Sequence, residues 1–392
     1  MGAMDAGTFL STQGDPGGAV EEVLSRGAQW VVDHGAPDLV CVFSTHHHAS
    51  AFAELARGVD DRIAPSGGWI GCTAEGVIGE GREIEGSPGL VLWMARWGGG
   101  AGVKTFHLTA DEKGALSGWP DPLPGREARP AVLLLGDPFS TPAETLLDHI
   151  NNELPGCPVF GGIASGASFQ GASTLFRDGR LHDEGVVGVL LTGAEAPMEA
   201  TCVVSQGCQP VGRTLSVTAH QENLIQTLDS RPALEVLQKM LSDLPPEQQD
   251  AARSGLHVGL GVDDWKEDLA RGDFLIRGII GIEPQTGAVA VNERLRADQR
   301  LQFHIRDAAS STEDLRSLLA AHSLGTSAGL LFACNGRGQR LYGRPDGDVS
   351  VVTEELGDAP VAGFHAAGEI GPVGGQAFLH GFTASLALFG DH

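Results

Sequence analysis

Three arginines lie beside apolar or glycine-rich stretches, where a guanidinium group has a specific chemical use. Arg277 and Arg306 fall inside apolar, strand-like segments, and Arg337 falls in a glycine-rich turn. A buried guanidinium is costly unless it is paired, and a small carboxylate ligand can pair with it through two parallel hydrogen bonds. These residues therefore indicate a site for a carboxylate. The alternative is an internal ion pair with one of three acidic residues, Asp307, Glu283 or Glu369.

Cys334, His365 and Glu369 lie near glycines in the last part of the chain. A thiol beside an arginine has a lowered pKa and is reactive, whereas a buried cysteine at a strand end is inert. His365 and Glu369 flank a glycine turn, where ligand contacts are common, and solvated loop charges are the alternative. We expect a pocket for a small zwitterion, with an arginine for its carboxylate and Glu369 for its amine. The expected lining is Cys334, Arg337, His365 and Glu369, with Arg306 or Arg277 nearby.

Motifs for catalysis and for metal binding are scarce. The sequence contains neither Gly-x-Ser-x-Gly nor His-Glu-x-x-His, so a thiol–imidazole pair of Cys334 and His365 is the one enzymatic alternative. The run His46-His47-His48 starts a helix, where adjacent side chains point in different directions and cannot all bind one metal. We expect no cofactor. Haem bound through a single histidine is the alternative, at His107, His149, His257, His304 or His380.

The composition excludes several classes of protein. The 392 residues carry 50 Asp and Glu against 26 Lys and Arg, a formal net charge of −24, which repels nucleic acid. The six cysteines are scattered without Cys-x-x-Cys spacing, which is typical of reduced thiols in the cytoplasm. No apolar run approaches the roughly 18 residues of a membrane helix, and no secretory signal starts the chain. We therefore expect a soluble, cytoplasmic protein.

A repeated glycine motif indicates how the chain positions these residues. Gly71–Gly79 and Gly363–Gly371 are identical at five of nine positions, and Gly161–Gly166 keeps the shared Gly-x-x-Ala-x-Gly core. Each copy follows an apolar strand and a helical pattern and precedes another apolar strand. The sequence predicts an α/β fold with mixed sheets, built from duplicated strand–helix–strand–strand units. Parallel strands would then place Cys334 and His365 at adjacent carboxyl ends, where ligands commonly bind.

Breaks in the pattern suggest two domains. We expect an N-terminal extension over residues 1–37, a first domain over 38–222 and a second over 231–390, each domain with its own core. The Pro- and Gly-rich residues 111–130 form a loop between the first two units.

Several blocks of sequence resemble the FIST (F-box and intracellular signal transduction) family. RPALEVL (231–237), DFLIRGIIGIEP (273–284), LQFHIRDAASSTEDL (301–315), LFACNGRG (331–338) and AGFHAAGEIGP (362–372) are similar to successive blocks of its C-terminal domain. GGWIGCTAEGVI (67–78) and VFGGIASG (159–166) resemble its N-terminal domain. The eukaryotic members carry an F-box, which this chain lacks.

The resemblance implies a sensory role in intracellular signal transduction. Members of the family bind small ligands such as amino acids or their derivatives and often work with histidine kinases or other signalling proteins. One branch resembles haem-binding nitric oxide sensors. We therefore expect a non-catalytic sensor of a small ligand, with a haem-based gas sensor or an enzyme dependent on Cys334 as the alternatives.

Overall fold

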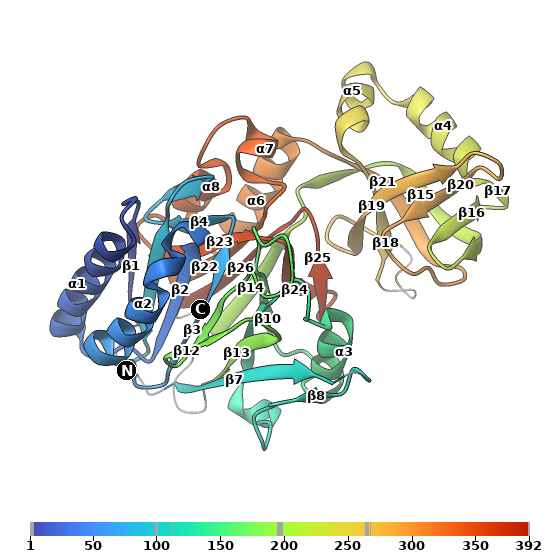
Figure 1. The fold of residues 1–392 in the computed structure, drawn as a ribbon. Coiled ribbons are helices and arrows are strands. Elements are labelled where there is room, and N and C mark those ends of the chain that lie inside the picture. Colours follow the sequence, from blue (N-terminus) through green and yellow to red (C-terminus); the bar gives the residue numbers. More distant parts are fainter. Residues whose placement is uncertain are drawn as a thin grey trace. The chain divides into compact units, whose positions relative to one another are not determined.

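The chain forms two compact units in the computed structural model, which describes residues 4–98, 101–111, 113–193, 199–262, 266 and 268–390 (Figure 1). The repeat unit combines residues 1–204 with residues 315–392, and the inserted unit runs from Ser205 to Asp314. This division differs from the expected cores at 38–222 and 231–390, because strands from the end of the chain pair with strands from its first half.

The repeat unit contains three mixed sheets, whose strands are named in their order of pairing. The first sheet consists of β1 (Asp5–Ser11), β6 (Leu90–Arg96), β2 (Leu39–Thr45), β3 (Trp69–Ala74), β11 (Leu175–Arg177) and β12 (Arg180–His182). The second consists of β25 (Gln376–His380), β24 (Gly368–Val373), β10 (Val159–Ile163), β9 (Ala131–Gly136), β13 (Val186–Thr192), β7 (Gly102–Ala110) and β8 (Leu116–Ser117). The third consists of β14 (Glu199–Ser205), β26 (Ala384–Gly390), β22 (Thr326–Cys334), β23 (Val361–Ala366), β4 (Gly76–Gly79) and β5 (Arg82–Glu85).

Each sheet is built on the same four-element repeat. A strand, a helical segment and a second, parallel strand are followed by a third strand that runs antiparallel to the first. The three sets are β2, β3 and β6; β9, β10 and β13; and β22, β23 and β26. The predicted α/β fold with mixed sheets and duplicated units is therefore confirmed.

The first residue of each motif must be glycine, for the same steric reason in all three copies. A Cβ added at Gly71, Gly161 or Gly363 would lie 2.2, 1.9 or 1.7 Å from the carbonyl oxygen of a residue on the neighbouring parallel strand. Real side chains do not approach backbone atoms so closely, so only glycine fits. The motif is thus a signature of close packing between two parallel strands.

A hairpin that begins within or after each glycine motif joins the sheet of another repeat. The hairpin β4–β5 of the first repeat pairs with β23 of the third. The hairpin β24–β25 of the third repeat pairs with β10 of the second, and β11–β12 of the second pairs with β3 of the first. The exchange is cyclic, so every repeat both gives and receives a hairpin.

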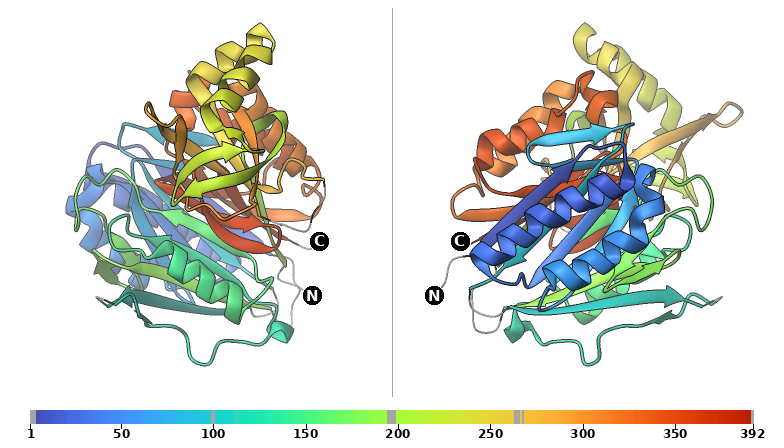
Figure 2. Two further views of the ribbon diagram at one scale, coloured as in Figure 1. Left: turned by 90° about the vertical axis from the view of Figure 1, so that its right-hand side faces the viewer. Right: turned by 60° about the vertical axis from the view of Figure 1, so that its left-hand side comes forward.

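Helices and a shared aromatic core complete the repeat unit. The helices α1 (Pro16–His34) and α2 (Phe52–Gly58) cover one face of the first sheet (Figure 2). Between the sheets, the rings of Phe43, Phe332 and Phe364 lie 5.2 to 6.4 Å apart and join the first repeat to the third. The remaining helices of this unit are η1 (His46–Ala51), η2 (Val59–Ile63), η3 (Arg126–Ala128), α3 (Ala143–Glu153), α7 (Gly338–Tyr342) and α8 (Gly347–Leu356).

The inserted unit is a closed ring of antiparallel strands. In order of pairing these are β15 (Cys208–Gln221), β21 (Arg300–Arg306), β18 (Leu256–Gly261), β19 (Phe274–Glu283), β20 (Ala288–Val291) and β16 (Leu224–Leu228). The pairing of β16 with β15 closes the ring, and β17 (Arg231–Pro232) extends β16. The unit also contains α4 (Ala233–Asp243) and α5 (Pro246–Gly255), and α6 (Ala308–Ala320) begins at its end. No helix among the described residues is long and apolar enough to cross a lipid bilayer.

Candidate functional site

Four of the six predicted site residues meet at the ends of β22 and β23. The parallel register places Ala333 beside His365 and Cys334 beside Ala366, and Glu369 follows in β24. Arg337 lies just after Cys334, at the start of α7. Only the position of these residues at neighbouring strand ends was therefore predictable from the sequence. However, Arg337 and Glu369 have no exposed surface, His365 is 2% exposed and Cys334 is 6% exposed, so the group lies inside the protein.

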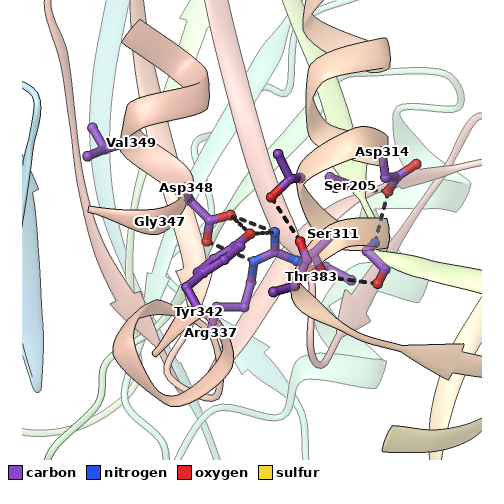
Figure 3. Close-up of polar contacts among 12 residues, drawn as sticks. Ser205, Ser311, Asp314, Arg337, Tyr342, Gly347, Asp348, Val349 and Thr383 are labelled. Atoms are coloured by element: carbon purple, nitrogen blue, oxygen red, sulfur yellow. Dashed lines mark hydrogen bonds and ion pairs between the residues drawn. The ribbon is translucent and has the colours of Figure 1, made fainter. Parts of the chain in front are cut away.

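The guanidinium group of Arg337 is hydrogen-bonded to other residues of the same chain. Its Nη2 and Nε donate to Oδ1 and Oδ2 of Asp348 at 2.6 and 2.8 Å, and Nη2 also donates to the Tyr342 hydroxyl at 2.9 Å (Figure 3). The Tyr342 hydroxyl in turn donates to Asp348. The internal partner is thus Asp348, not one of the three acidic residues expected from the sequence. Arg337 is not available to a ligand carboxylate in this structure.

The pKa values of Asp348 and Glu369 are shifted in opposite directions, although both side chains are buried. Burial alone would raise the pKa of Asp348, but the Arg337 guanidinium outweighs burial and holds that pKa below its usual value. Burial raises the pKa of Glu369 to about 8, although its Oε2 accepts hydrogen bonds from the backbone N–H and hydroxyl of Thr383. Glu369 is therefore mainly protonated at neutral pH and a poor partner for a ligand amine.

Two glutamates that were not expected at this site face His365. Glu83 and Glu85 lie on β5, and the exchanged hairpin carries them to the third sheet. Oε1 of Glu83 accepts hydrogen bonds from the backbone N–H groups of Asp348 and Val349 at the start of α8. Its Oε2 lies 3.9 Å from Nε2 of His365. Burial, and then the negative Asp348, raise the pKa of Glu83 to about 8.

Cys334 and His365 do not form the thiol–imidazole pair considered from the sequence. Cys334 is in register with Ala366, whereas His365 is in register with Ala333. Because side chains alternate along a strand, Cys334 and His365 point to opposite faces of the sheet. The Cys334 thiol lies beside Glu369 and accepts a hydrogen bond from the backbone N–H of Gly336.

Arg277 and Arg306, predicted to lie near the other four residues, belong to the inserted unit. Arg277 lies on β19 and donates from Nε to Oε2 of Glu293 at 2.8 Å, so its partner also differs from the expected ones. Arg306 ends β21, where it is in register with Cys208. Nothing in the sequence signals that these two arginines belong to another compact unit than the other four residues.

The inserted unit contains a pocket of about 350 Å³ beside α4, β15 and β16. Six apolar side chains line it: Leu215, Leu228, Val236, Met240, Leu244 and Phe303. Charged side chains also line it: Arg213, Asp229, Arg231, Lys239 and Asp243. Arg213 pairs with Asp229 at 2.5 Å and Lys239 with Asp243 at 2.9 Å. Within the part of the chain that the structure describes, Arg231 forms no ion pair and is exposed.

Two other pockets lie in the repeat unit. One of about 430 Å³ is lined by Arg126, Arg129 and Leu154, and otherwise by prolines and small residues, chiefly around Pro155–Pro158. The other, of about 310 Å³, lies beside α8 around Gly357–Val361. Neither has as many large apolar side chains in its lining as the pocket of the inserted unit, which has six. That pocket is therefore the better candidate for a small organic ligand.

Comparison with known proteins agrees with the two-part organisation of the sequence. Residues 38–231 match the model of the FIST N domain, and residues 233–372 match that of the FIST C domain. An uncharacterized protein of Mycobacterium tuberculosis is 38% identical over 395 residues, which cover 99% of this chain and 100% of the relative. An uncharacterized protein of Mycobacterium bovis is 40% identical over 363 residues, 91% of each protein.

Proposed function

The chain belongs to the FIST family, and on that basis we propose that it is a non-catalytic sensor of a small carboxylate metabolite, such as an amino acid. FIST domains are associated with signal transduction and small-ligand sensing. The proposed ligand site is the pocket of the inserted unit. A histidine kinase or another signalling protein is the proposed partner that carries the output.

The pocket beside α4 supports this proposal. Small-molecule sites are typically cavities of about 300–1,000 Å³ with a mainly apolar lining and a few polar groups that orient the ligand. This pocket has about 350 Å³, and its apolar side chains suit the body of a small metabolite. Arg231, which has no acidic partner among the described residues, suits a carboxylate. Asp229 and Asp243 would bind an amine only by exchanging their present partners, Arg213 and Lys239.

The absence of a thiol–imidazole pair supports a binding role over a catalytic one. Cys334 and His365 are the residues that an enzymatic mechanism would use, and the strand register directs them to opposite faces. We propose that ligand sensing requires neither haem nor an organic cofactor, and that a haem-based gas sensor is the alternative to be excluded by experiment.

The experiment is a thermal-shift screen of amino acids and small carboxylates, followed by calorimetric titration of the strongest compound. A ligand at 100 times its Kd stabilises the protein by about 2.7 kcal/mol, which such a screen detects. Arg231→Gln should weaken binding about tenfold to a hundredfold, because it removes a charge-assisted hydrogen bond worth roughly 1.5–3 kcal/mol. Arg253→Gln is the matched control, since Arg253 pairs with Asp250 and is not part of the pocket lining. Equal affinities in both variants would refute the pocket as the site.

A further inference from the structure

We propose that Glu83, Glu85 and His365 form a binding site for a divalent metal ion of the zinc class. One potential ligand atom from each residue lies within 4.8 Å of the other two. The glutamates come from β5 of the first repeat and the histidine from β23 of the third. The site would therefore hold the exchanged hairpin β4–β5 against the strand that receives it.

Unsatisfied atoms point into this site. His365 is 2% exposed, and its ring lies near the backbone of Cys334, but within the described residues neither ring nitrogen makes a hydrogen bond of normal geometry. Oε2 of Glu83, which is 4% exposed, also lacks a hydrogen-bond partner there. Buried polar atoms without partners are rare in proteins, and each requires a reason. A shared metal ion satisfies Oε2 of Glu83 and one ring nitrogen of His365 at once.

The distance between the two residues fits a metal better than a hydrogen bond. Oε2 of Glu83 and Nε2 of His365 are 3.9 Å apart, which is too long for a hydrogen bond and too short for a bridging water. Two ligands bound tetrahedrally to zinc at about 2.1 Å lie roughly 3.4 Å apart. A closing movement of about half an ångström brings the pair to that distance.

The charges around the site favour a cation. Asp348 adjoins Glu83, but its charge is balanced by Arg337. Arg340 pairs with Glu75. Among the described residues, Glu83 and Glu85 form no ion pair with an arginine or lysine. Burial and the negative Asp348 raise the pKa of Glu83 to about 8, so without a cation its carboxyl is mainly protonated, and a bound divalent ion would take the place of that proton.

The donor set identifies the class of ion. One imidazole nitrogen with two carboxylate oxygens suits zinc and its neighbours among the transition metals, whereas calcium and magnesium prefer oxygen donors alone. Three protein ligands are typical of a zinc site that keeps one position for water. Glu85 is half-buried, which gives an ion a path from solvent, and its Oε1 is held by the backbone N–H of Gln339.

The test is metal binding by the full, tag-free chain after treatment with a chelator. Titration calorimetry with Zn²⁺ should show one ion per chain, and Co²⁺ should give a visible absorption band from nitrogen and oxygen ligation. Glu85→Gln and His365→Gln should each weaken binding at least tenfold. Glu75→Gln and His48→Gln are matched controls and should bind as the wild type does, because Glu75 pairs with Arg340 and His48 is a second buried histidine without hydrogen-bond partners among the described atoms.

Each outcome decides the proposal. A rise in melting temperature with Zn²⁺ in the wild type and in both controls, but not in Glu85→Gln, supports the site. Glu85 is partly exposed, so this variant should fold even if His365→Gln does not. No binding of Zn²⁺ or Co²⁺ by the wild type, or the same loss in Glu75→Gln as in Glu85→Gln, would overturn the proposal.

Discussion

Oε2 of Glu83 lies 3.9 Å from Nε2 of His365, although the two residues belong to the first and the third repeat. The other carboxylate oxygen of Glu83 accepts hydrogen bonds from Asp348 and Val349, which start α8. One side chain thus contacts both the strand and the helix of a repeat that is not its own. The exchanged hairpin is bound by polar side-chain contacts as well as by strand pairing.

Glu83→Ala should destabilise the repeat unit by about 1–3 kcal/mol, because it leaves two backbone N–H groups at the start of α8 without an acceptor. Chemical denaturation followed by circular dichroism measures the change. Glu83→Gln keeps an acceptor oxygen and should lose clearly less stability. If the two variants were equally unstable, the hydrogen bonds to α8 would not be the cause.

Arg337→Met should destabilise the protein by about 3–5 kcal/mol, because it leaves Asp348 buried without its partner. The double variant Arg337→Met/Asp348→Asn removes the unpaired charge and should recover a large part of that loss. A double-mutant cycle from denaturation data gives the coupling between the two residues. Additive effects of the two substitutions would contradict a buried ion pair.

Gly363→Ala should cost about 4 kcal/mol or more or prevent folding, because the new Cβ would meet the carbonyl oxygen of Leu331, and backbone atoms cannot move aside. The soluble yield and the melting temperature report the effect. Gly381→Ala, in the same repeat, is the control, since its Cβ meets nothing within 4 Å and its backbone is not left-handed. A mild effect at Gly363 would refute the steric origin of the glycine motif.

The free energy of unfolding should fall as the pH rises from about 4.5 to 8, because of the ionisation of Glu369. Its pKa is raised by burial to about 8 in the folded chain, from an ordinary value of 4.5, so the folded state holds a proton that the unfolded state releases. The free energy of unfolding then falls by about 1.4 kcal/mol per pH unit over this range. The groups that face Glu369 are Arg337, Cys334 and His380, which is opposite in register.

Denaturation of the wild type and Glu369→Gln between pH 5 and pH 8 tests this dependence. The variant cannot ionise, so its advantage over the wild type should grow with pH across the interval. Glu354→Gln, at an exposed glutamate, should keep the wild-type slope. Parallel curves for the wild type and Glu369→Gln would show that Glu369 does not titrate in this range.

The purified protein should be colourless. No histidine in the sequence has a haem-specific motif, and the acidic chain has few cations to hold the propionates. An absorption spectrum of the protein, taken as purified and after incubation with haem, should lack a Soret band of stoichiometric strength. Such a band would instead favour the gas-sensor alternative.

The repeats were predictable because their signal is local. Each glycine motif reflects a contact between two strands that are close in sequence, such as that of Gly363 with Leu331, so the motif and its flanking strands identify the unit. The same reasoning placed Cys334 and His365 at adjacent strand ends, as observed. Local packing rules were sufficient for this part of the fold.

The exchange of hairpins was not predictable in the same way. A hairpin can form backbone hydrogen bonds with any free strand edge, and the residue types in β4 and β5 do not specify which strand they pair with. The contacts of Glu83 and Glu85 with the third repeat therefore had no local signal. The partner of Arg337 was missed for a related reason. Asp348 lies in the first turn of α8, which is held by Glu83 of the exchanged hairpin.

The cyclic exchange also constrains how the chain can fold as it is synthesised. The first sheet gains its last hairpin from residues 175–182, but the second needs residues 368–380 and the third needs the strand at 384–390. The repeat unit is therefore completed only after residues 368–390 have left the ribosome. Residues 205–314, whose strand ring needs no other segment, can fold well before that point. A truncated chain that ends near residue 360 should thus contain a folded inserted unit and an incomplete repeat unit.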